Sequence, residues 1–245
     1  MSRKIAVITG ASQGLGLSMA KALIDNGYLV ESWDLTEAPQ IEGLSFQKVN
    51  VASESDVKSA TDKVISTLGV PMALVCNAGI TKDSLSHKMT TEQFDQVVDV
   101  NLKGTYLPCR YLGTAMRDAN SALIKEGGDA VWRRILTVSS VAGLFGNVGQ
   151  LNYSATKAGV VAMAKTLAKE WGRFNISVSS VAPGVMNTEM TQTIPQEVKQ
   201  SFIDRTPLQR IGEPEELADF VAYLCSKKSA FLTGDVIAFS GGLLL

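Results

Sequence analysis

The sequence predicts an α/β protein built on one parallel β-sheet with helices on both faces. Short apolar runs typical of buried strands alternate with segments whose apolar residues recur at helical spacing. A glycine-rich loop directly follows the first apolar run, as it does in doubly wound sheets. Because no break is long enough for a linker, we expect residues 1–245 to form a single domain.

The composition excludes several classes of partner. The chain has 245 residues, 45% of them hydrophobic, and a formal net charge of −1, which argues against nucleic acid or an anionic membrane surface. No apolar run reaches the roughly 18 residues of a membrane-spanning helix, and the apolar N-terminal segment is too short for a signal peptide. The isolated Cys76, Cys109 and Cys225 favour a reducing compartment, so we expect a cytoplasmic protein. With His87 as the only histidine, we expect no metal site.

The first strand and the loop after it predict an anion site. Lys4–Thr9 is a nearly continuous apolar run, and Leu17–Asn26 reads as a helix that ends at Gly27. In the loop between them, glycines permit a tight turn and a close approach to the backbone, while free N–H groups and the helix dipole attract a pyrophosphate. The spacing is G-x-x-x-G-x-G, which differs from the general G-x-G-x-x-G fingerprint. The predicted cofactor residues of this loop are Gly10, Ser12, Gln13, Gly14, Leu15 and Gly16.

The second predicted strand, Tyr28–Trp33, ends at an acidic residue that bears on cofactor choice. Asp34 is suited to the ribose hydroxyls of an adenine dinucleotide; a solvated loop aspartate is the alternative. Its carboxylate would repel the 2′-phosphate of NADP(H), and the nearest candidate positions for a compensating cation, Gln13 and Leu35, are uncharged. We therefore expect NAD(H) as the cofactor.

The third and fourth strands end in further candidates. Leu44–Val49 predicts the third strand, after which Asn50 and Val51 are placed to flank the adenine. An amphipathic helix at Glu54–Leu68 leads to the fourth strand, Met72–Cys76. That strand ends where the crevice of a doubly wound sheet lies, at Asn77, Ala78 and Gly79.

The middle of the chain predicts one long helix, Thr91–Tyr111. Asn101 lies in its interior, where asparagine is a poor helix former, so a specific hydrogen bond is plausible; an ordinary helical asparagine is the alternative. Residues 118–132 are polar and irregular, which predicts an exposed helix end and a loop. The fifth strand, Arg134–Val138, follows.

The stretch after the fifth strand carries the candidate chemistry. Tyr153 and Lys157 are four residues apart on a predicted helix, 153–171, so phenol and ammonium share one face. We expect the ammonium to lower the pKa of the phenol, which would then transfer protons near physiological pH. Ser140 lies where the loop could bring its hydroxyl beside the same reacting oxygen. A surface tyrosine–lysine pair is the alternative.

The C-terminal third completes the alternation. Ile176–Val181 predicts the sixth strand, a helix begins at Glu213–Glu216 and runs to Leu224, and Val236–Phe239 predicts the last strand. Val185–Arg210 is richer in methionine, threonine and glutamine, which predicts a mobile segment that covers the substrate.

Several motifs in order resemble the short-chain dehydrogenase/reductase family over essentially the full length. They are T-G-A-S-Q-G-L-G at 9–16, C-N-A-G at 76–79, N-L at 101, Ser140, Y-S-A-T-K at 153–157 and P-G-V-M-N-T at 183–188. Segments such as NAGITKDSL and GNVGQLNYSATKAG are similar to those of 3-oxoacyl-carrier-protein reductases. Three features depart from the family pattern: Cys76, the uncharged Gln13, and a longer segment at 118–133.

The resemblance implies a Rossmann-type sheet of about seven parallel strands and a role for each site residue. Tyr153 is the general acid in reduction and the general base in oxidation. Lys157 lowers the pKa of Tyr153 and binds the nicotinamide ribose, Ser140 polarises the substrate oxygen, and Asn101 helps to hold a proton-relaying water. The resemblance also adds cofactor contacts at Pro183, Gly184, Met186 and Thr188.

The expected function is interconversion of a ketone and a secondary alcohol with NAD(H). The first hypothesis is a 3-oxoacyl reductase or 3-hydroxyacyl dehydrogenase acting on an acyl thioester of carrier protein or coenzyme A. A general secondary-alcohol dehydrogenase is the alternative, and a non-catalytic dinucleotide sensor is a third. A basic patch for an acidic carrier would comprise Arg133, Arg134, Lys169 and Arg173, with scattered solvated charges as the alternative. Apolar or small residues on more than one face of the helices at 92–111 and 153–171, together with the resemblance, predict a homotetramer: Val100, Leu107, Ala158, Val161, Ala162, Ala164 and Leu167.

Overall fold

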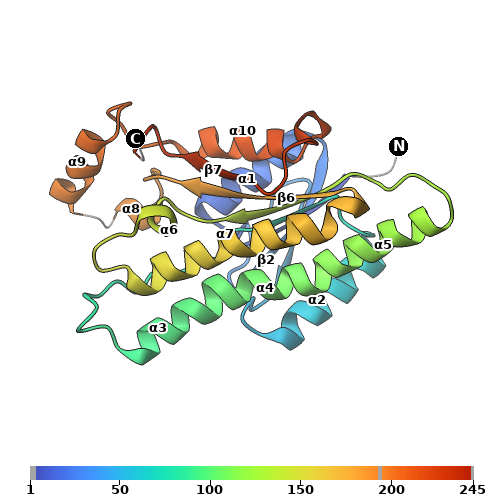
Figure 1. Ribbon diagram of the computed structural model, residues 1–245, viewed down its shortest axis with the longest axis horizontal. Coiled ribbons are helices and arrows are strands. Elements are labelled where there is room, and N and C mark those ends of the chain that lie inside the picture. Colours follow the sequence, from blue (N-terminus) through green and yellow to red (C-terminus); the bar gives the residue numbers. More distant parts are fainter. Residues whose placement is uncertain (1–3, 193–194, 244–245) are drawn as a thin grey trace.

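Seven parallel strands form one sheet in the computed structural model, which describes residues 4–192 and 195–243 (Figure 1). Their order is β3-β2-β1-β4-β5-β6-β7. Strands β1 to β3 extend the sheet towards one edge and β4 to β7 extend it towards the other, so the strand order reverses where β1 and β4 lie side by side. This confirms the predicted doubly wound α/β fold, which places ligands at the carboxyl ends of the strands near that reversal. The strands are β1 Lys4–Thr9, β2 Tyr28–Asp34, β3 Leu44–Lys48, β4 Ala73–Cys76, β5 Arg133–Val138, β6 Ile176–Pro183 and β7 Val236–Phe239.

Helices cover both faces of the sheet (Figure 1). Helices α1 and α10 pack against each other on one face, and α2, the α3–α5 stretch and α7 lie on the other. None of the described helices combines the length and the apolar character that crossing a membrane requires. The helices are α1 Gly14–Asp25, α2 Glu54–Thr67, α3 Thr91–Val97, α4 Gly104–Pro108, α5 Thr114–Lys125, α6 Ala142–Phe145, α7 Leu151–Trp171, α8 Glu189–Gln192, α9 Gln196–Arg205 and α10 Pro214–Leu224.

The two faces of the sheet bury separate hydrophobic clusters because side chains alternate along a strand. On β1, Ala6 and Ile8 pack with Met19 of α1 and Leu217 of α10. The intervening Val7 belongs to the second cluster, with residues of α2 and α7. A first strand that is apolar on both faces is therefore covered on both faces, as its sequence predicts.

The long helix in the middle of the chain extends further than its sequence indicates. Two π-helical segments, η1 Val98–Lys103 and η2 Cys109–Gly113, join α3, α4 and α5 into one stretch that ends at Lys125. Pro108 has no N–H to donate and directly precedes η2, where the hydrogen-bond pattern widens. The predicted irregular segment is thus helical up to Lys125, and only the part from 126 to 132 forms a loop.

Strand β5 begins with Arg133 and Arg134, for which the sequence left two alternatives, a basic surface patch or scattered solvated charges. Arg134 is fully buried and Arg133 is 6% exposed. Arg133 donates to the side chain of Asn120 and to the carbonyl oxygen of Val70. Arg134 donates to the carbonyl oxygen of Leu224, at the end of α10. Two of the four proposed patch residues are therefore in the interior, so a four-residue basic patch is contradicted.

Candidate active site

The glycine loop leaves the first turn of α1 open to a ligand. Gly10 and Gly14 have φ values of +69° and +54°, which L side chains rarely adopt. A Cβ atom on Gly16 would lie 1.9 Å from the backbone carbonyl oxygen of Gly10, so only glycine fits there. Gln13 precedes the helix in extended conformation, and within the described residues no side chain caps this end of α1. The geometry is that of a helix N-terminus able to hold a pyrophosphate.

Residues at the end of β4 hold the glycine loop from behind. The side-chain amide of Asn77 donates to the carbonyl oxygens of Thr9 and Gly10, at 3.1 and 2.9 Å. The hydroxyl of Thr9 accepts the N–H groups of Asn77 and Ala78, both at 3.0 Å. Asn77 and Ala78 therefore shape the predicted cofactor loop, and Thr9 is a supporting residue that the strand pattern did not single out.

Asp34 lies beside the glycine loop, as the sequence predicts. One carboxylate oxygen accepts the N–H of Ser12 at 3.0 Å, and the other accepts the N–H groups of Leu35 and Thr36 at 2.7 and 3.3 Å. The Ser12 hydroxyl donates to the carbonyl oxygen of Thr36 at 2.6 Å. These bonds fix the carboxylate at the rim of the loop, and none of the ion pairs among the described residues involves it.

The two residues predicted to flank the adenine differ in exposure. Asn50 is exposed, and its side chain accepts the N–H of Ala52 at 3.0 Å. Val51 is buried against the long helix, where a Cβ atom on Gly104 would lie 2.7 Å from its side chain. Val51 thus anchors this end of the loop, while Asn50 remains accessible.

The four predicted catalytic residues come from three different elements. Tyr153 and Lys157 lie on α7, Ser140 lies in the turn between β5 and α6, and Asn101 lies in η1. The Lys157 ammonium is 5.6 Å from the centre of the Tyr153 ring. A Cβ atom on Gly79 would lie 3.3 Å from Asn101 Oδ1 and 3.4 Å from Lys157 Nζ, so Gly79 packs over both groups.

Asn101 makes the specific hydrogen bonds expected of an asparagine inside a helix. It is fully buried, and its amide exchanges two hydrogen bonds with the backbone of Ile80, at 2.8 and 3.0 Å. It also donates to Thr156 on α7 at 3.4 Å. Asn101 therefore ties the segment after β4 to α7, and its place in a π-helical segment fits the frequent use of such segments at functional sites.

The expected lowering of the Tyr153 pKa by Lys157 is contradicted by this geometry. Burial raises the pKa of Tyr153 above its ordinary value; the hydrogen bond with Ser140 lowers it, and the charge of Asp83 raises it. Lys157 directs its ammonium to the carbonyl oxygen of Val138, at 2.7 Å, rather than to the phenol oxygen. Burial also lowers the pKa of Lys157 from 10.5 to about 8, with a smaller opposing effect of Cys76.

Two buried residues support the catalytic helix and were not found from the sequence. Asn152 donates to the carbonyl oxygens of Lys82 and Gln93 and accepts the N–H of Tyr153 at 2.7 Å. Ser139 donates to the carbonyl oxygen of Lys157 at 2.8 Å. Each directly precedes a predicted catalytic residue, Tyr153 and Ser140, and this adjacency is the only signal that the sequence offered.

The predicted contacts after β6 line the same edge of the sheet. The carbonyl oxygen of Pro183 accepts the N–H of Val141, which joins the end of β6 to the turn of Ser140. Gly184 packs against Ser240, where a Cβ atom would come within 3.0 Å of the backbone. Met186 is buried, and the half-buried Thr188 receives a hydrogen bond from Thr191.

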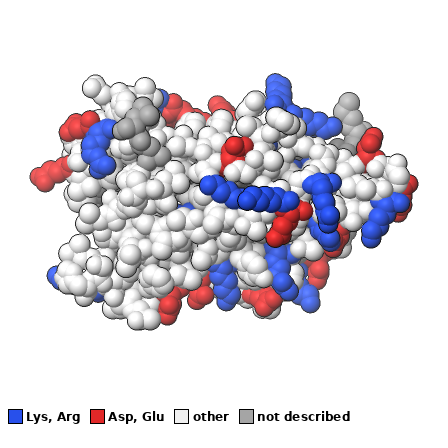
Figure 2. Space-filling view, viewed as in Figure 1, with Lys and Arg blue, Asp and Glu red and all other residues white. Residues whose placement is uncertain are grey.

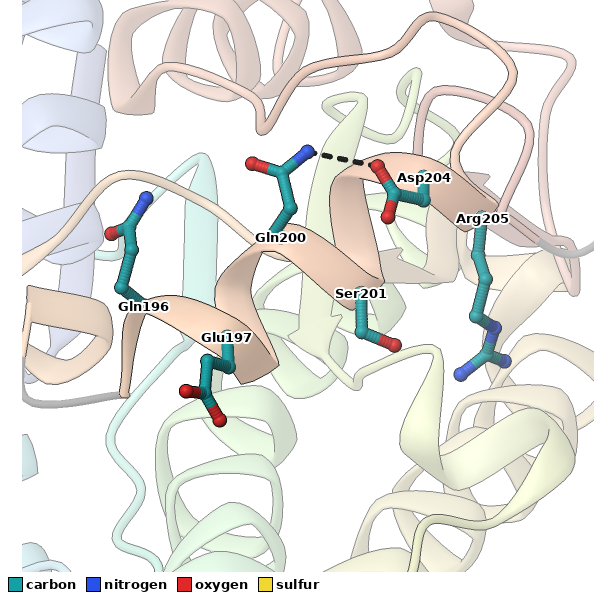
Figure 3. A pocket seen from close by; sticks show the side chains of 6 residues that line it. All are labelled: Gln196, Glu197, Gln200, Ser201, Asp204 and Arg205. Carbon is teal, nitrogen blue, oxygen red and sulfur yellow. Dashed lines mark hydrogen bonds between the residues drawn. The ribbon is translucent and has the colours of Figure 1, made fainter.

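The predicted covering segment forms helices α8 and α9 beyond the carboxyl ends of the strands, at the left of Figure 1; residues 193–194 lie outside the described residues. A hollow on α9 is lined only by side chains of that exposed helix, with Gln200 donating to Asp204 at 2.8 Å (Figure 3). It contains none of the predicted site residues, so we do not place the reacting centre there. Across the described part of the chain, no cluster of three or more histidine, cysteine, aspartate or glutamate residues is arranged to hold a metal ion.

Comparisons with known proteins identify the family of the chain. A family model described as enoyl-(acyl carrier protein) reductase matches residues 10–244. The chain is 37% identical to a 3-oxoacyl-[acyl-carrier-protein] reductase FabG of Thermotoga maritima, over 99% of this chain and 98% of that protein. It is 36% identical to the proteins of the same name from Aquifex aeolicus and Staphylococcus epidermidis, over 97–99% of each chain. The chain belongs to the short-chain dehydrogenase/reductase family.

Proposed function

We propose that the protein is an NAD(H)-dependent oxidoreductase that interconverts a 3-oxoacyl thioester and the corresponding 3-hydroxyacyl thioester. The observation that carries this is the meeting of Ser140, Tyr153, Lys157 and Asn101 at the edge of the sheet that also holds the glycine loop. The relatives, which are named 3-oxoacyl-[acyl-carrier-protein] reductases, support the choice of a 3-oxoacyl substrate. An intact set of proton-transferring residues argues against a non-catalytic dinucleotide sensor.

The chain's residues divide the work of this reaction. A bound dinucleotide supplies or accepts the hydride. Tyr153 donates its phenol proton to the substrate oxygen in reduction and removes it in oxidation. Ser140 donates a hydrogen bond to the same oxygen and thereby polarises the carbonyl. Lys157 presents a buried cation to the nicotinamide ribose, and Asn101 helps to hold a water that relays protons to it.

The glycine loop and Asp34 support a dinucleotide cofactor and a preference for NAD(H). The uncapped first turn of α1 offers N–H groups to the pyrophosphate, from Gln13, Gly14, Leu15 and Gly16. Asp34 would accept hydrogen bonds from the ribose hydroxyls, each about 1.5–3 kcal/mol when one partner is charged. A 2′-phosphate would instead meet a carboxylate that has no cationic partner among the described residues. The remaining proposed contacts are Ser12, Asn50, Val51, Asn77, Ala78, Gly79, Pro183, Gly184, Met186 and Thr188.

The alternative to a substrate attached to an acidic carrier is a simple secondary alcohol or ketone. Burial of Arg133 and Arg134 leaves only Lys169 and Arg173 of the proposed patch exposed, which weakens the case for an acidic carrier at that surface. This favours, as a second candidate, a dehydrogenase or reductase of simple secondary alcohols and ketones. In either case we propose that residues 185–210 cover the bound substrate.

We also propose a homotetramer, with a narrower contact face than the sequence indicated. Leu107 and Ala164 are buried within the protomer, so they cannot face a second subunit. The other predicted residues remain partly or fully exposed on neighbouring helices: Val100, Ala158, Val161, Ala162 and Leu167. Figure 2, viewed as in Figure 1, shows few charged side chains over the centre of the left half of the molecule, whereas the upper left and the right carry more.

A substrate panel read by NADH absorbance tests the proposed function. The panel sets acetoacetyl coenzyme A, and acetoacetyl carrier protein at equal concentration, against simple alkyl and aryl ketones. We expect higher kcat/KM for the thioesters. A preference for the simple ketones would favour the second candidate, and no turnover of any compound would contradict an oxidoreductase of this class.

A further inference from the structure

The turn that carries Ser140 is held against a single residue of the catalytic helix. The Ser139 hydroxyl donates to the carbonyl oxygen of Lys157 at 2.8 Å, and the Lys157 ammonium donates to the carbonyl oxygen of Val138 at 2.7 Å. Main chain and side chain of Lys157 thus both bond to the segment before Ser140. These two bonds fix where the turn lies along α7.

A third contact fixes how closely the turn approaches the helix. A Cβ atom on Gly143 would lie 2.7 Å from the carbonyl carbon of Lys157, 2.8 Å from its Cβ and 2.9 Å from the nitrogen of Ala158. Two of these three atoms belong to the backbone, so they cannot rotate away. Gly143 is absent from the glycines with positive φ in the described chain, so its conformation suits alanine and only the spacing excludes a side chain.

Gly143 and Ser140 belong to the same tight turn. The N–H of Gly143 donates to the carbonyl oxygen of Ser140 at 2.9 Å, and the N–H of Ala142 donates to the Ser140 hydroxyl at 3.2 Å. If α6 moved outward from α7, Ser140 would move with it. Tyr153 lies one turn before Lys157 on α7 and would stay in place.

We propose that Gly143 is a positioning residue: by having no side chain, it sets the separation between the Ser140 turn and α7, and so brings the hydroxyls of Ser140 and Tyr153 to the same substrate oxygen. This rests on the proposed function. Misplacement of a catalytic group by about 1 Å can lower the rate by about two orders of magnitude. The largest effect of a side chain at this position is therefore on kcat.

The test compares Gly143→Ala with Gly172→Ala. Gly172 ends α7, has a negative φ and has no atom within 4 Å of an added Cβ, so its substitution controls for a general effect of removing a glycine. For Gly143→Ala we expect a fall in kcat of about tenfold or more, with NADH affinity within about twofold of wild type. Gly172→Ala should retain wild-type kcat.

A second readout does not depend on turnover. Ultraviolet titration of the free protein, taken as wild type minus Tyr153→Phe, reports ionisation of the Tyr153 phenol. Burial raises the pKa of Tyr153, the hydrogen bond with Ser140 lowers it, and the charge of Asp83 raises it. Moving Ser140 away in Gly143→Ala should therefore raise the phenol pKa, while Gly172→Ala leaves it unchanged.

Folded Gly143→Ala with wild-type kcat and an unchanged phenol titration would overturn the proposal, as would an equal loss of kcat in Gly172→Ala. If Gly143→Ala does not fold, Ser139→Ala loosens the same contact without adding atoms. It should lower kcat and raise the phenol pKa, and wild-type values for both would overturn the proposal. If wild type turns over no compound of the panel, the proposed function fails, yet the titration still tests the positioning.

Discussion

Strand β5 has a buried cation at each end, and the two cations are held in different ways. Arg134 lies at its start and is fully buried; Lys157, which is 4% exposed, reaches the carbonyl oxygen of Val138 at its end. Within the described residues, neither belongs to an ion pair shorter than 4 Å. Burying an unpaired charge is costly, so each position needs a physical explanation.

Arg134 is surrounded by acceptors. It donates to the carbonyl oxygens of Leu224, Ser229 and Leu232 at 2.8–2.9 Å, and to the hydroxyls of Ser229 and Ser179 at 2.9 and 3.3 Å. Burial lowers the pKa of this guanidinium, but arginine stays charged in proteins. Arg134 therefore fastens the segment after α10 to β5, and its contribution is to stability.

The Lys157 ammonium makes one hydrogen bond in the described structure, although an ammonium has three donors. Burial lowers its pKa to about 8, which brings loss of its proton close to physiological pH. The two cations at the ends of this strand therefore differ. Arg134, away from the site, is fully hydrogen-bonded and stays charged, whereas the Lys157 ammonium, within the site, has few hydrogen bonds and can lose its proton. Strongly perturbed groups of the second kind are typical of functional sites.

The largest expected effect concerns the fixed cation. Arg134→Met removes the buried guanidinium that donates to the carbonyl oxygens of Leu224, Ser229 and Leu232, so we expect a loss of about 3–5 kcal/mol in the free energy of unfolding. The control, Lys169→Met on the exposed side of α7, should cost less than about 0.5 kcal/mol. Urea denaturation measures both. Wild-type stability in Arg134→Met would show that these bonds do not fasten the segment.

The second effect is the pH dependence that the titratable cation imparts. The folded-state pKa of Lys157 is about 8 and its ordinary value is 10.5. Between these pH values the unfolded chain still holds a proton that the folded chain has released, so this group makes stability rise with pH. We expect the stability of wild type relative to Lys157→Met to increase by about 3 kcal/mol from pH 7.5 to 10.5. Using the difference removes the contributions of other titrating groups. A difference that is constant across this pH range would contradict the depressed pKa.

The smallest expected effect is on cofactor choice. It extends the comparison of charged residues to the carboxylate of Asp34, which lies beside the glycine loop. Asp34 should favour NADH over NADPH by more than about 1.4 kcal/mol, or roughly tenfold in kcat/KM. The double variant Asp34→Ser, Gln13→Arg should weaken or reverse this preference. If the unmodified protein uses NADPH as well as or better than NADH, Asp34 does not contact the ribose as proposed.

The parallel sheet, the glycine loop and the placing of Asp34 followed from local patterns. Apolar runs of the right length specify buried strands, and the order of strand, glycines and helix places an anion site without knowledge of distant contacts. The four candidate catalytic residues were found because Tyr153 and Lys157 share a helix face and because the spacing to Ser140 and Asn101 matches a known family.

What failed depended on contacts between residues far apart in the chain. Arginines at 133 and 134 suggested a surface patch, but their partners include the carbonyl oxygens of Val70 and Leu224, which no local pattern connects to β5. The predicted direction of the Tyr153 pKa shift was wrong. The spacing of residues along a helix indicates that Lys157 is near Tyr153, but it does not indicate that Tyr153 is buried. The π-helical segments likewise depend on packing, which the helical spacing of apolar residues in the sequence does not indicate.

Proton transfer by Tyr153 is the central claim, and Tyr153→Phe tests it most directly. The substitution removes one hydroxyl and keeps the ring that packs beside Lys157, so NADH binding measured by fluorescence should stay close to that of wild type. Single-turnover reduction of acetoacetyl coenzyme A should slow by about 10²–10⁴-fold, the usual scale of general acid catalysis. A variant that binds NADH and reduces the substrate at the wild-type rate would show that another group supplies the proton.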